Sequence, residues 1–231
     1  MSPRHFDERV GGRPVSGEEY NPGPATPPRQ AATVILLRGG TEKLEVLLVR
    51  RTPKARFMGG VWVFPGGAVD PSDAPPTGSA PADNEHQVEE QALRAAAARE
   101  LREEAGIALT HPADLVEFSR WITPAEVHTR FDTHFFLAPL PAGQEPKVDG
   151  EECVDLGWFT PAAALEAHGD EQIVLVFPTI KHLEQLQAFS SVDALLRYAR
   201  GRKVQPIQPR VVVDGEVARV LLPGEPGYDD P

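Results

Sequence analysis

Short apolar runs separated by glycine and proline predict a series of strands that begins just after residue 30. Thr33–Leu37 and Leu44–Val49 are rich in branched side chains and flank Gly39-Gly40, which is typical of a hairpin. A third, shorter run at Val61–Phe64 ends at Pro65-Gly66-Gly67, where a turn is expected. Further strands are expected at Leu115–Trp121, Arg130–Leu137 and Val154–Phe159.

One long helix and several shorter ones account for the remaining apolar pattern. Apolar residues recur at helical spacing over about Gln87–Ala105, and Gly106 is a suitable C-terminal glycine to end this helix. A short helix is expected to begin near Pro161, and a helix or a pair of helices covers roughly Thr179–Tyr198. Strands, one central helix, more strands and then helices predict an α+β domain with a sheet between helical layers.

Proline divides the chain into a central domain and two extensions. There are 24 prolines, twice the usual share of about 5%, and they concentrate in three places. Residues 1–29 are expected to form an extended N-terminal arm, and residues 30–204 the domain, with a loop insertion at about 71–86. Residues 205–231 are a proline-rich tail, expected as a hairpin packed on the domain. The expected hairpin consists of Val211–Val213, Asp214-Gly215 and Val217–Leu222.

Composition and charge narrow the class of protein and of partner. The net charge is −11, which argues against nucleic acid as a partner because such binding normally requires a basic surface. A small anionic substrate stays compatible, since a divalent cation reverses the local field of an acidic site. The chain has no run of the roughly 18 apolar residues that a membrane helix needs, and it has a single cysteine. No secretory leader is expected, because the first residues lack an apolar stretch. A cytoplasmic protein without membrane contact is therefore expected.

The C-terminal half of the long helix carries the residues that suggest chemistry. Ala97 and Leu101 share a face that can pack on a sheet, whereas another face is shared by Glu100, Glu103 and Glu104. These carboxylates repel one another, and they lie near a helix C-terminus, where negative charge is disfavoured. Mg²⁺ or Mn²⁺ would relieve the repulsion, because hard cations prefer carboxylate oxygens. Taken alone, a helix rich in alanine, glutamate and arginine fits a solvated surface better than a metal site.

The residues around these glutamates resemble a known signature. Arg99–Ile107 reads Arg-Glu-Leu-Arg-Glu-Glu-Ala-Gly-Ile and matches the core Arg-Glu-aliphatic-x-Glu-Glu-x-Gly-aliphatic at every position. This is the signature of the Nudix hydrolase family, which the chain therefore resembles. The resemblance implies an α/β/α sandwich with a mixed β-sheet and metal-dependent hydrolysis of a small-molecule diphosphate. It places Glu100, Glu103 and Glu104 on Mg²⁺ or Mn²⁺ and gives Arg99 a structural role in the site.

The front half of the signature leaves one acid position open. Gly66 and Gly67 follow a predicted strand and are expected to bring backbone N–H groups to the substrate. Five residues separate Gly67 from Asp73, as the signature requires, but 25 residues then precede Arg99 instead of seven. Alignment backwards from Arg99 without a gap puts Gln91 in the acid position. Further candidates for this position, on the same helix, are Glu89 and Glu90.

The acid that removes a proton from the attacking water is expected near the metal. Glu100 or Glu103 can take this role, and so can an acid from a later loop. Among the loop residues the candidate is Glu152, in the Glu151-Glu152 pair before a predicted strand, although such pairs also occur in ordinary turns. Cys153, the next residue, has no base near it in sequence and is expected to pack in the core.

A second, wider resemblance concerns the substrate. The stretch from Arg50-Arg51-Thr52-Pro53 to Phe64–Asp70 is similar to the Nudix branch of coenzyme A diphosphatases, which also has a long insertion in the signature. This implies coenzyme A or an acyl-coenzyme A as substrate. Arg50 and Arg51 are candidates to receive a phosphate of such a substrate, and the alternative is a basic strand end that balances an acidic chain. The alternatives are a nucleoside diphosphate sugar or dinucleotide pyrophosphatase, and a catalytically weak Nudix module that binds a ligand. The resemblance also allows a homodimer.

Overall fold

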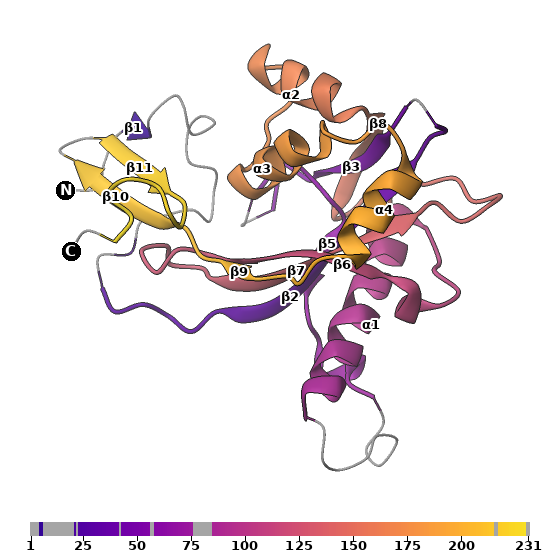
Figure 1. The fold of residues 1–231 in the computed structure, drawn as a ribbon, viewed down its shortest axis with the longest axis horizontal. Coiled ribbons are helices and arrows are strands. Elements are labelled where there is room, and N and C mark those ends of the chain that lie inside the picture. The colour runs from indigo at the N-terminus through magenta and orange to yellow at the C-terminus, as the bar shows by residue number, and fades with distance from the viewer. Residues whose placement is uncertain are drawn as a thin grey trace.

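A mixed sheet of eight strands separates helices on its two faces (Figure 1). The computed structural model describes residues 5–6, 21, 23–41, 43–55, 58–75, 85–214 and 217–229. The strands of this sheet are β2 (Arg29–Arg38), β3 (Glu45–Arg51), β4 (Trp62–Val63), β5 (Gly66–Ala68), β6 (Val116–Ile122), β7 (Phe131–Pro139), β8 (Cys153–Phe159) and β9 (Pro206–Ile207). The helices are α1 (Glu85–Ala105), α2 (Pro161–Gly169), α3 (Phe177–Leu186) and α4 (Val192–Arg200). Over the described part of the chain, no helix has the length and apolar character that crossing a membrane requires.

The strands follow the order β4-β3-β2-β7-β6-β9. At the centre, β2 runs parallel to β7, with Arg29 opposite Phe131 and Leu37 opposite Pro139. β2 and β3 pair only at their hairpin end, and they diverge from there. β5 pairs with β2 and β4 pairs with β3, so these two short strands occupy the space between the diverging strands. β8 pairs with β3.

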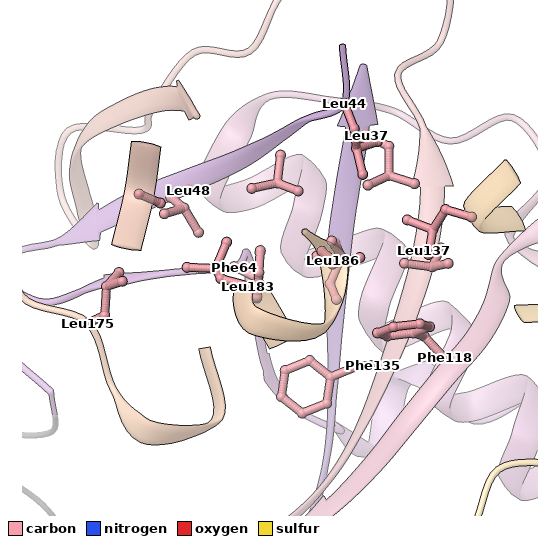
Figure 2. Packing of buried hydrophobic residues seen from close by; sticks show 14 of the residues in the cluster. Leu37, Leu44, Leu48, Phe64, Phe118, Phe135, Leu137, Leu175, Leu183 and Leu186 are labelled. Carbon is pink, nitrogen blue, oxygen red and sulfur yellow. The ribbon is translucent and has the colours of Figure 1, made fainter. Parts of the chain in front are cut away.

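Two apolar clusters, one on each face of the sheet, produce the layered arrangement. Every residue of Ala31–Leu37 in β2 is buried, because helices cover both faces of this strand. Val34 belongs to the cluster under α1, and Ile35 belongs to the cluster under α2, α3 and α4. Figure 2 shows side chains of the second cluster, among them Leu183 and Leu186 of α3. The expected α+β fold, with a mixed sheet between helices, is confirmed.

A smaller sheet joins segments from the two ends of the chain. β10 (Arg210–Asp214) and β11 (Val217–Leu221) form an antiparallel hairpin where one is expected, and β1 (His5–Phe6) pairs with β11 in parallel. Figure 1 shows this sheet at the left, away from α1. Gly215 of the expected turn lies outside the described residues. Also outside them are 1–4 and 7–20 of the expected arm and 76–84 of the expected insertion.

Local boundaries differ from the expectation in two places. The third strand is confined to Trp62–Val63, and Gly66–Ala68, expected as a turn, forms β5 by pairing with Ala31–Thr33. Two consecutive glycines carry no strand pattern, so only the partner strand reveals this element. The long helix begins at Glu85 instead of Gln87. The later helical region, expected as one helix or a pair, forms the pair α3 and α4.

Candidate active site

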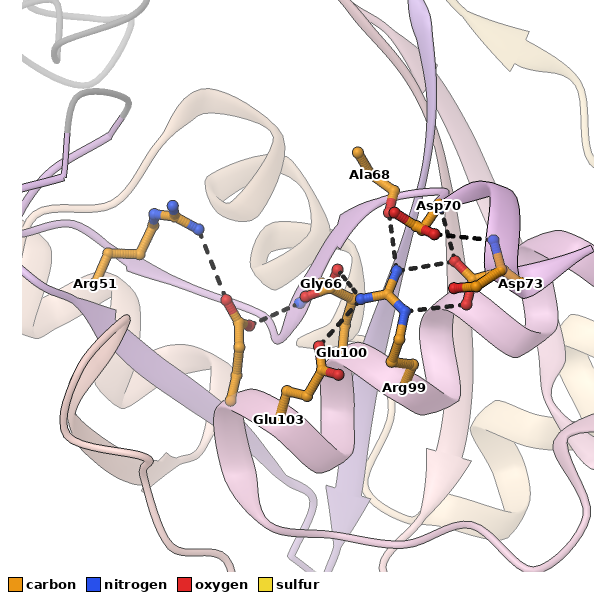
Figure 3. Close-up of polar contacts among 10 residues, drawn as sticks. Arg51, Gly66, Ala68, Asp70, Asp73, Arg99, Glu100 and Glu103 are labelled. Atoms are coloured by element: carbon orange, nitrogen blue, oxygen red, sulfur yellow. Dashed lines mark hydrogen bonds and ion pairs between the residues drawn. The ribbon is translucent and has the colours of Figure 1, made fainter.

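The C-terminal half of α1 lies against the sheet through small and apolar side chains. Ala96, Ala97, Leu101 and Ala105 are buried in the cluster that includes β2 and β3. Because alanine adds little bulk, the helix approaches the sheet closely. This packing brings Glu100, on the adjacent helix face, to the glycines of β5 (Figure 3).

Glu104 is the most deeply buried of the three glutamates expected to bind metal. Its side chain is 2% exposed, compared with 12% for Glu100 and 52% for Glu103. Gly66 donates its backbone N–H to Glu104 Oε2 at 2.9 Å, and Arg51 Nη1 lies 3.7 Å from Glu104 Oε1. Burial raises the pKa of Glu104 to about 7, although the bond from Gly66 and the charge of Arg51 oppose this. The ionised form of Glu104 therefore depends on positive charge nearby.

Glu100 lies directly against Gly67. A Cβ added at Gly67 would overlap the Glu100 carboxylate, so any other residue here would displace that carboxylate from its present position. Burial raises the pKa of Glu100, and the carboxylates of Glu103 and Glu152 add to the increase. The two glycines of β5, which are expected to face the substrate, thus contact two of the glutamates.

Arg99 connects the glutamates of α1 to the segment that follows β5 (Figure 3). Its Nη1 donates to Glu100 Oε1 at 2.7 Å and to Glu103 Oε2 at 3.1 Å. Its Nε and Nη2 donate to the two carboxylate oxygens of Asp73 at 3.0 and 2.9 Å, and Nη2 also donates to the carbonyl of Ala68 at 3.0 Å. Hydrogen bonds to Asp73 and then to Glu100 raise the pKa of Arg99, so the guanidinium stays charged. Arg99 thereby fixes the directions of three acids, Asp73, Glu100 and Glu103.

The contact between Arg99 and Asp73 distinguishes among the candidates for the first acid of the signature, which the sequence leaves open. The Asp73 side chain is 4% exposed and receives two hydrogen bonds from Arg99, across the 25 intervening residues. Glu89, Glu90 and Gln91 are instead exposed on α1, at least two turns before Arg99. Of the four candidates, Asp73 is the one that the fold brings to Arg99.

The turn before β8 brings Glu152 to the same region. The backbone N–H of Thr52 donates to the carbonyl of Glu152 at 2.8 Å, so the turn is attached to the end of β3. The Glu152 carboxylate is exposed, and it lies close enough to Glu100 to raise the pKa of that residue. Cys153, expected in the core, is fully buried, and burial raises the pKa of its thiol.

Arg50 and Arg51, both expected to bind a substrate phosphate, lie on opposite faces of the sheet. Val49 and Arg51 share the α1 face, where Arg51 approaches Glu104, whereas Leu48 and Arg50 share the other face. The structure therefore brings Arg51 to the glutamates and leaves Arg50 away from them. The buried Nε of Arg51 has no hydrogen-bond partner within the described residues.

Sequence reasoning missed one residue that organises the turn, Asp149. Its carboxylate accepts the backbone N–H groups of Glu152 and Cys153, both at 2.9 Å. Burial raises the pKa of Asp149, but these backbone bonds outweigh burial, and the pKa lies below its ordinary value. The signal available in the sequence was the Asp149-Gly150 pair, because Asp-Gly commonly forms a turn before a strand.

The oxygen-rich donor set of this site suits Mg²⁺ or Mn²⁺. The charge of Glu100 raises the pKa of buried Glu104, and a hard cation shared by the two carboxylates would remove this penalty. Glu100 and Glu103 are directed towards Arg99. Within the part of the chain that the structure describes, no three acidic, histidine or cysteine side chains converge closely enough to hold an ion. The oxygen atoms of these glutamates are thus of the kind that binds a divalent cation, but they do not converge in this conformation. Glu103 would have to turn away from Arg99 to bind the ion with the other two.

Comparisons with known proteins relate this site to a family. The NUDIX domain matches residues 27–177 of the chain. The acyl-coenzyme A diphosphatase NUDT19 of Homo sapiens is 25% identical over 300 residues, which cover 87% of this chain and 80% of that protein. The Xenopus laevis protein of the same name is 28% identical over 119 residues, which cover 50% of this chain and 31% of that protein.

Among solved structures, the NUDIX hydrolase from Alicyclobacillus acidocaldarius is 28% identical and has a TM-score of 0.61, over 74% of this chain and 96% of that one. The resemblance to Nudix hydrolases, and to the coenzyme A diphosphatases among them, is thus confirmed. With the family's domain over residues 27–177, which include the glutamates of α1 and the glycines of β5, the chain belongs to the Nudix family and is a hydrolase of diphosphate bonds.

Proposed function

We propose that this Nudix hydrolase requires a divalent cation and that its substrate is coenzyme A or an acyl-coenzyme A. The observation that carries the metal requirement is the pair of Glu104, which is buried, and Glu100, which is partly buried, beside Gly66 and Gly67. Support for the substrate comes from the similarity to NUDT19, which extends over 80% of that protein.

In this proposal, Glu100, Glu103 and Glu104 hold Mg²⁺ or Mn²⁺. When bound, such an ion neutralises charge on the diphosphate and lowers the pKa of a coordinated water. Arg99 orients the first two glutamates, and the N–H of Gly66 orients the third. Glu103 is half exposed, so its carboxylate has room to turn from Arg99 to a cation.

Glu152 is the general base of the proposed reaction. The water oxygen attacks one phosphorus atom, a water proton passes to the Glu152 carboxylate, and the P–O bond to the second phosphate breaks, so that this phosphate leaves with the bonding electrons. Glu152 suits this role because it is exposed and near Glu100, and because its carboxylate makes no hydrogen bond or ion pair with the described residues. Glu100 and Glu103, the other candidates, are engaged by Arg99.

Arg51 is the basic residue proposed to contact a substrate phosphate. It lies at the end of β3 on the face of the glutamates, and its Nε keeps a donor without a partner among the described residues. Arg50, on the opposite face, is left out of this assignment.

The test is product analysis with coenzyme A, acetyl-coenzyme A, UDP-glucose and a dinucleoside tetraphosphate, each with Mg²⁺, with Mn²⁺ and with EDTA. We expect metal-dependent release of a phosphopantetheine product from the coenzyme A compounds. Glu100→Gln and Glu104→Gln should each lower kcat/KM on the order of 100-fold or more, because each removes a charged oxygen ligand. Glu85→Gln, an exposed acid at the other end of α1, is the matched control and should keep full activity.

Preferential cleavage of UDP-glucose or of the dinucleotide would refute the coenzyme A assignment. If no compound is cleaved, while one of them binds equally to the wild-type protein and to Glu100→Gln, the protein is a Nudix binding module instead.

A further inference from the structure

The turn that carries Glu152 is attached to both elements that contribute to the glutamate cluster. At its start, the backbone N–H of Lys147 donates to the carbonyl of Ala105, the last residue of α1, at 2.8 Å. At its end, the carbonyl of Glu152 accepts the N–H of Thr52, directly after β3, at 2.8 Å. The segment 147–152 therefore bridges the helix of Glu104 and the strand of Arg51.

Between these two attachments, the carboxylate of Asp149 closes the turn. Oδ2 accepts the N–H of Glu152 and Oδ1 accepts the N–H of Cys153, both at 2.9 Å. Gly150 has a φ of +82°, and its N–H donates to the carbonyl of Cys153 at 2.9 Å. The Asp149 side chain and one backbone hydrogen bond thus hold the turn from Gly150 to Cys153.

The direction of the Glu152 side chain depends on this backbone. The peptide groups on either side of its Cα are both fixed, the N–H by Asp149 and the carbonyl by Thr52. The carboxylate itself has no hydrogen bond or ion pair with the described residues. Among the described residues, it is therefore the conformation of the turn that directs this carboxylate towards Glu100.

We infer that Asp149 is a positioning residue for the hydrolysis: by holding the turn, it keeps the Glu152 carboxylate where a proton of the attacking water can reach it. This inference rests on the proposed function, in which Glu152 is the general base. Asp149 need not touch the substrate or the metal ion for this role. A turn that serves only stability would need the same hydrogen bonds, so the experiment has to separate an effect on proton removal from an effect on folding.

The kinetic test uses Asp149→Ala, Asp149→Asn and a control, Glu145→Ala, which removes an exposed acid of the same loop. The probe is acetyl-coenzyme A with Mn²⁺. We expect Asp149→Ala to lower kcat by about 10- to 100-fold, as loss of an orienting partner commonly does, with KM changed less than about twofold. Asp149→Asn keeps one carbonyl acceptor and should recover part of the loss. Glu145→Ala should behave as wild type.

The specificity of the effect is tested in a second background. Glu152→Gln removes the proposed base, so adding Asp149→Ala to it should cause no further loss of kcat if Asp149 acts through Glu152. Amide hydrogen exchange of Glu152 and Cys153, measured by NMR in the metal-free protein, gives a readout independent of activity. We expect exchange at both amides to rise by about tenfold or more in Asp149→Ala, and not in Glu145→Ala.

An unchanged kcat in Asp149→Ala would overturn the inference, and so would an equal loss in the wild-type and Glu152→Gln backgrounds. Slow exchange that persists in Asp149→Ala would also overturn it, because the turn would then be held by other contacts. The proposed function fails in a different way: the wild-type protein itself would leave acetyl-coenzyme A intact, or Glu152→Gln would keep full activity.

Discussion

The smallest residue of the site sets the geometry of the acids on α1. Gly67 leaves room for the Glu100 carboxylate, which an added Cβ would push away. Its neighbour Gly66 is similarly enclosed, with Thr33 Oγ1 at 2.4 Å from the position of an added Cβ. An added Cβ at Gly67 would therefore displace the Glu100 carboxylate, whereas one at Gly66 would press against β2 and disturb the pairing that holds β5 in place.

Gly67→Ala is expected to abolish most activity without unfolding the protein. The added methyl group displaces the Glu100 carboxylate, and a misplacement of about 1 Å in an active site can cost about 100-fold in rate. Steady-state kinetics and a thermal melt of the same sample measure the two effects. The control is Gly169→Ala, where an added Cβ meets nothing within 4 Å. Full activity in Gly67→Ala would show that Glu100 can move without consequence.

Asp73→Ala is expected to lower the free energy of unfolding by about 2 to 4 kcal/mol, because it leaves the guanidinium of Arg99 without its bidentate partner in a largely buried position. Urea unfolding of the metal-free protein measures this change. Glu90→Ala removes an exposed partner of Arg94 and should cost less than about 1 kcal/mol. Equal costs for the two variants would mean that burial of Asp73 adds nothing to its bond with Arg99.

Elements with a local pattern could be predicted from the sequence, and elements defined by distant partners could not. α1 was placed to within two residues, because its apolar face and Gly106 are local signals. β5 was missed because it exists only through its pairing with β2. Asp73 stayed one of several candidates for the same reason, since its contact with Arg99 spans an insertion. Arg50 was grouped with Arg51, although strand alternation alone separates neighbouring side chains.

The packing of α3 on the sheet depends on an uncharged histidine. His182 is buried among aromatic rings; its Nδ1 lies 2.6 Å from the carbonyl of Pro178 and its Nε2 lies 2.5 Å from Ser119 Oγ. Burial lowers the pKa of His182 to about 4, from an ordinary value of 6.5. Below pH 6.5 the unfolded chain therefore binds a proton that the folded protein does not accept until about pH 4.

The stabilisation that depends on neutral His182 is therefore complete above pH 6.5 and is lost as the pH falls from 6.5 to 4. Over this range the free energy of unfolding should fall by about 3 kcal/mol. Glu104 has the opposite effect: because its pKa is raised to about 7, the folded protein gains stability from its protonation as the pH falls below 7. The quantity to measure is thus the difference in unfolding free energy between wild type and His182→Gln, from pH 7.5 to 4.5 in EDTA. It should shrink towards low pH, and two parallel curves would contradict the prediction.

For the whole molecule, the site links parts that are distant in the chain. Arg51 of β3, Gly66 of β5 and Asp73 beyond it all contact glutamates or Arg99 of α1, and Glu152 precedes β8. These elements belong to one sheet and one of its covering helices. A cation bound at the glutamates would therefore stabilise α1 together with the ends of β3 and β5 that contact it.

We expect Mg²⁺ or Mn²⁺, at a concentration 100 times its dissociation constant, to raise the Tm by about 5 to 10 °C. The increase should be absent in the Glu100→Gln/Glu104→Gln double variant and present in Glu85→Gln. Differential scanning fluorimetry with and without the ion measures it. The same shift in the double variant would place the ion at another site.

The parallel pairing of β1 with β11 has a consequence for the protein's synthesis on the ribosome. His5 lies opposite Val217. β1 is therefore synthesised early but cannot pair until β11, more than two hundred residues later, has been synthesised. The main sheet up to β7, with α1, can form while translation continues, because domains begin to fold from the N-terminal side of a growing chain. A nascent chain stalled before β11 would therefore already contain the glutamates and glycines of the site, while β1 would still be without its partner.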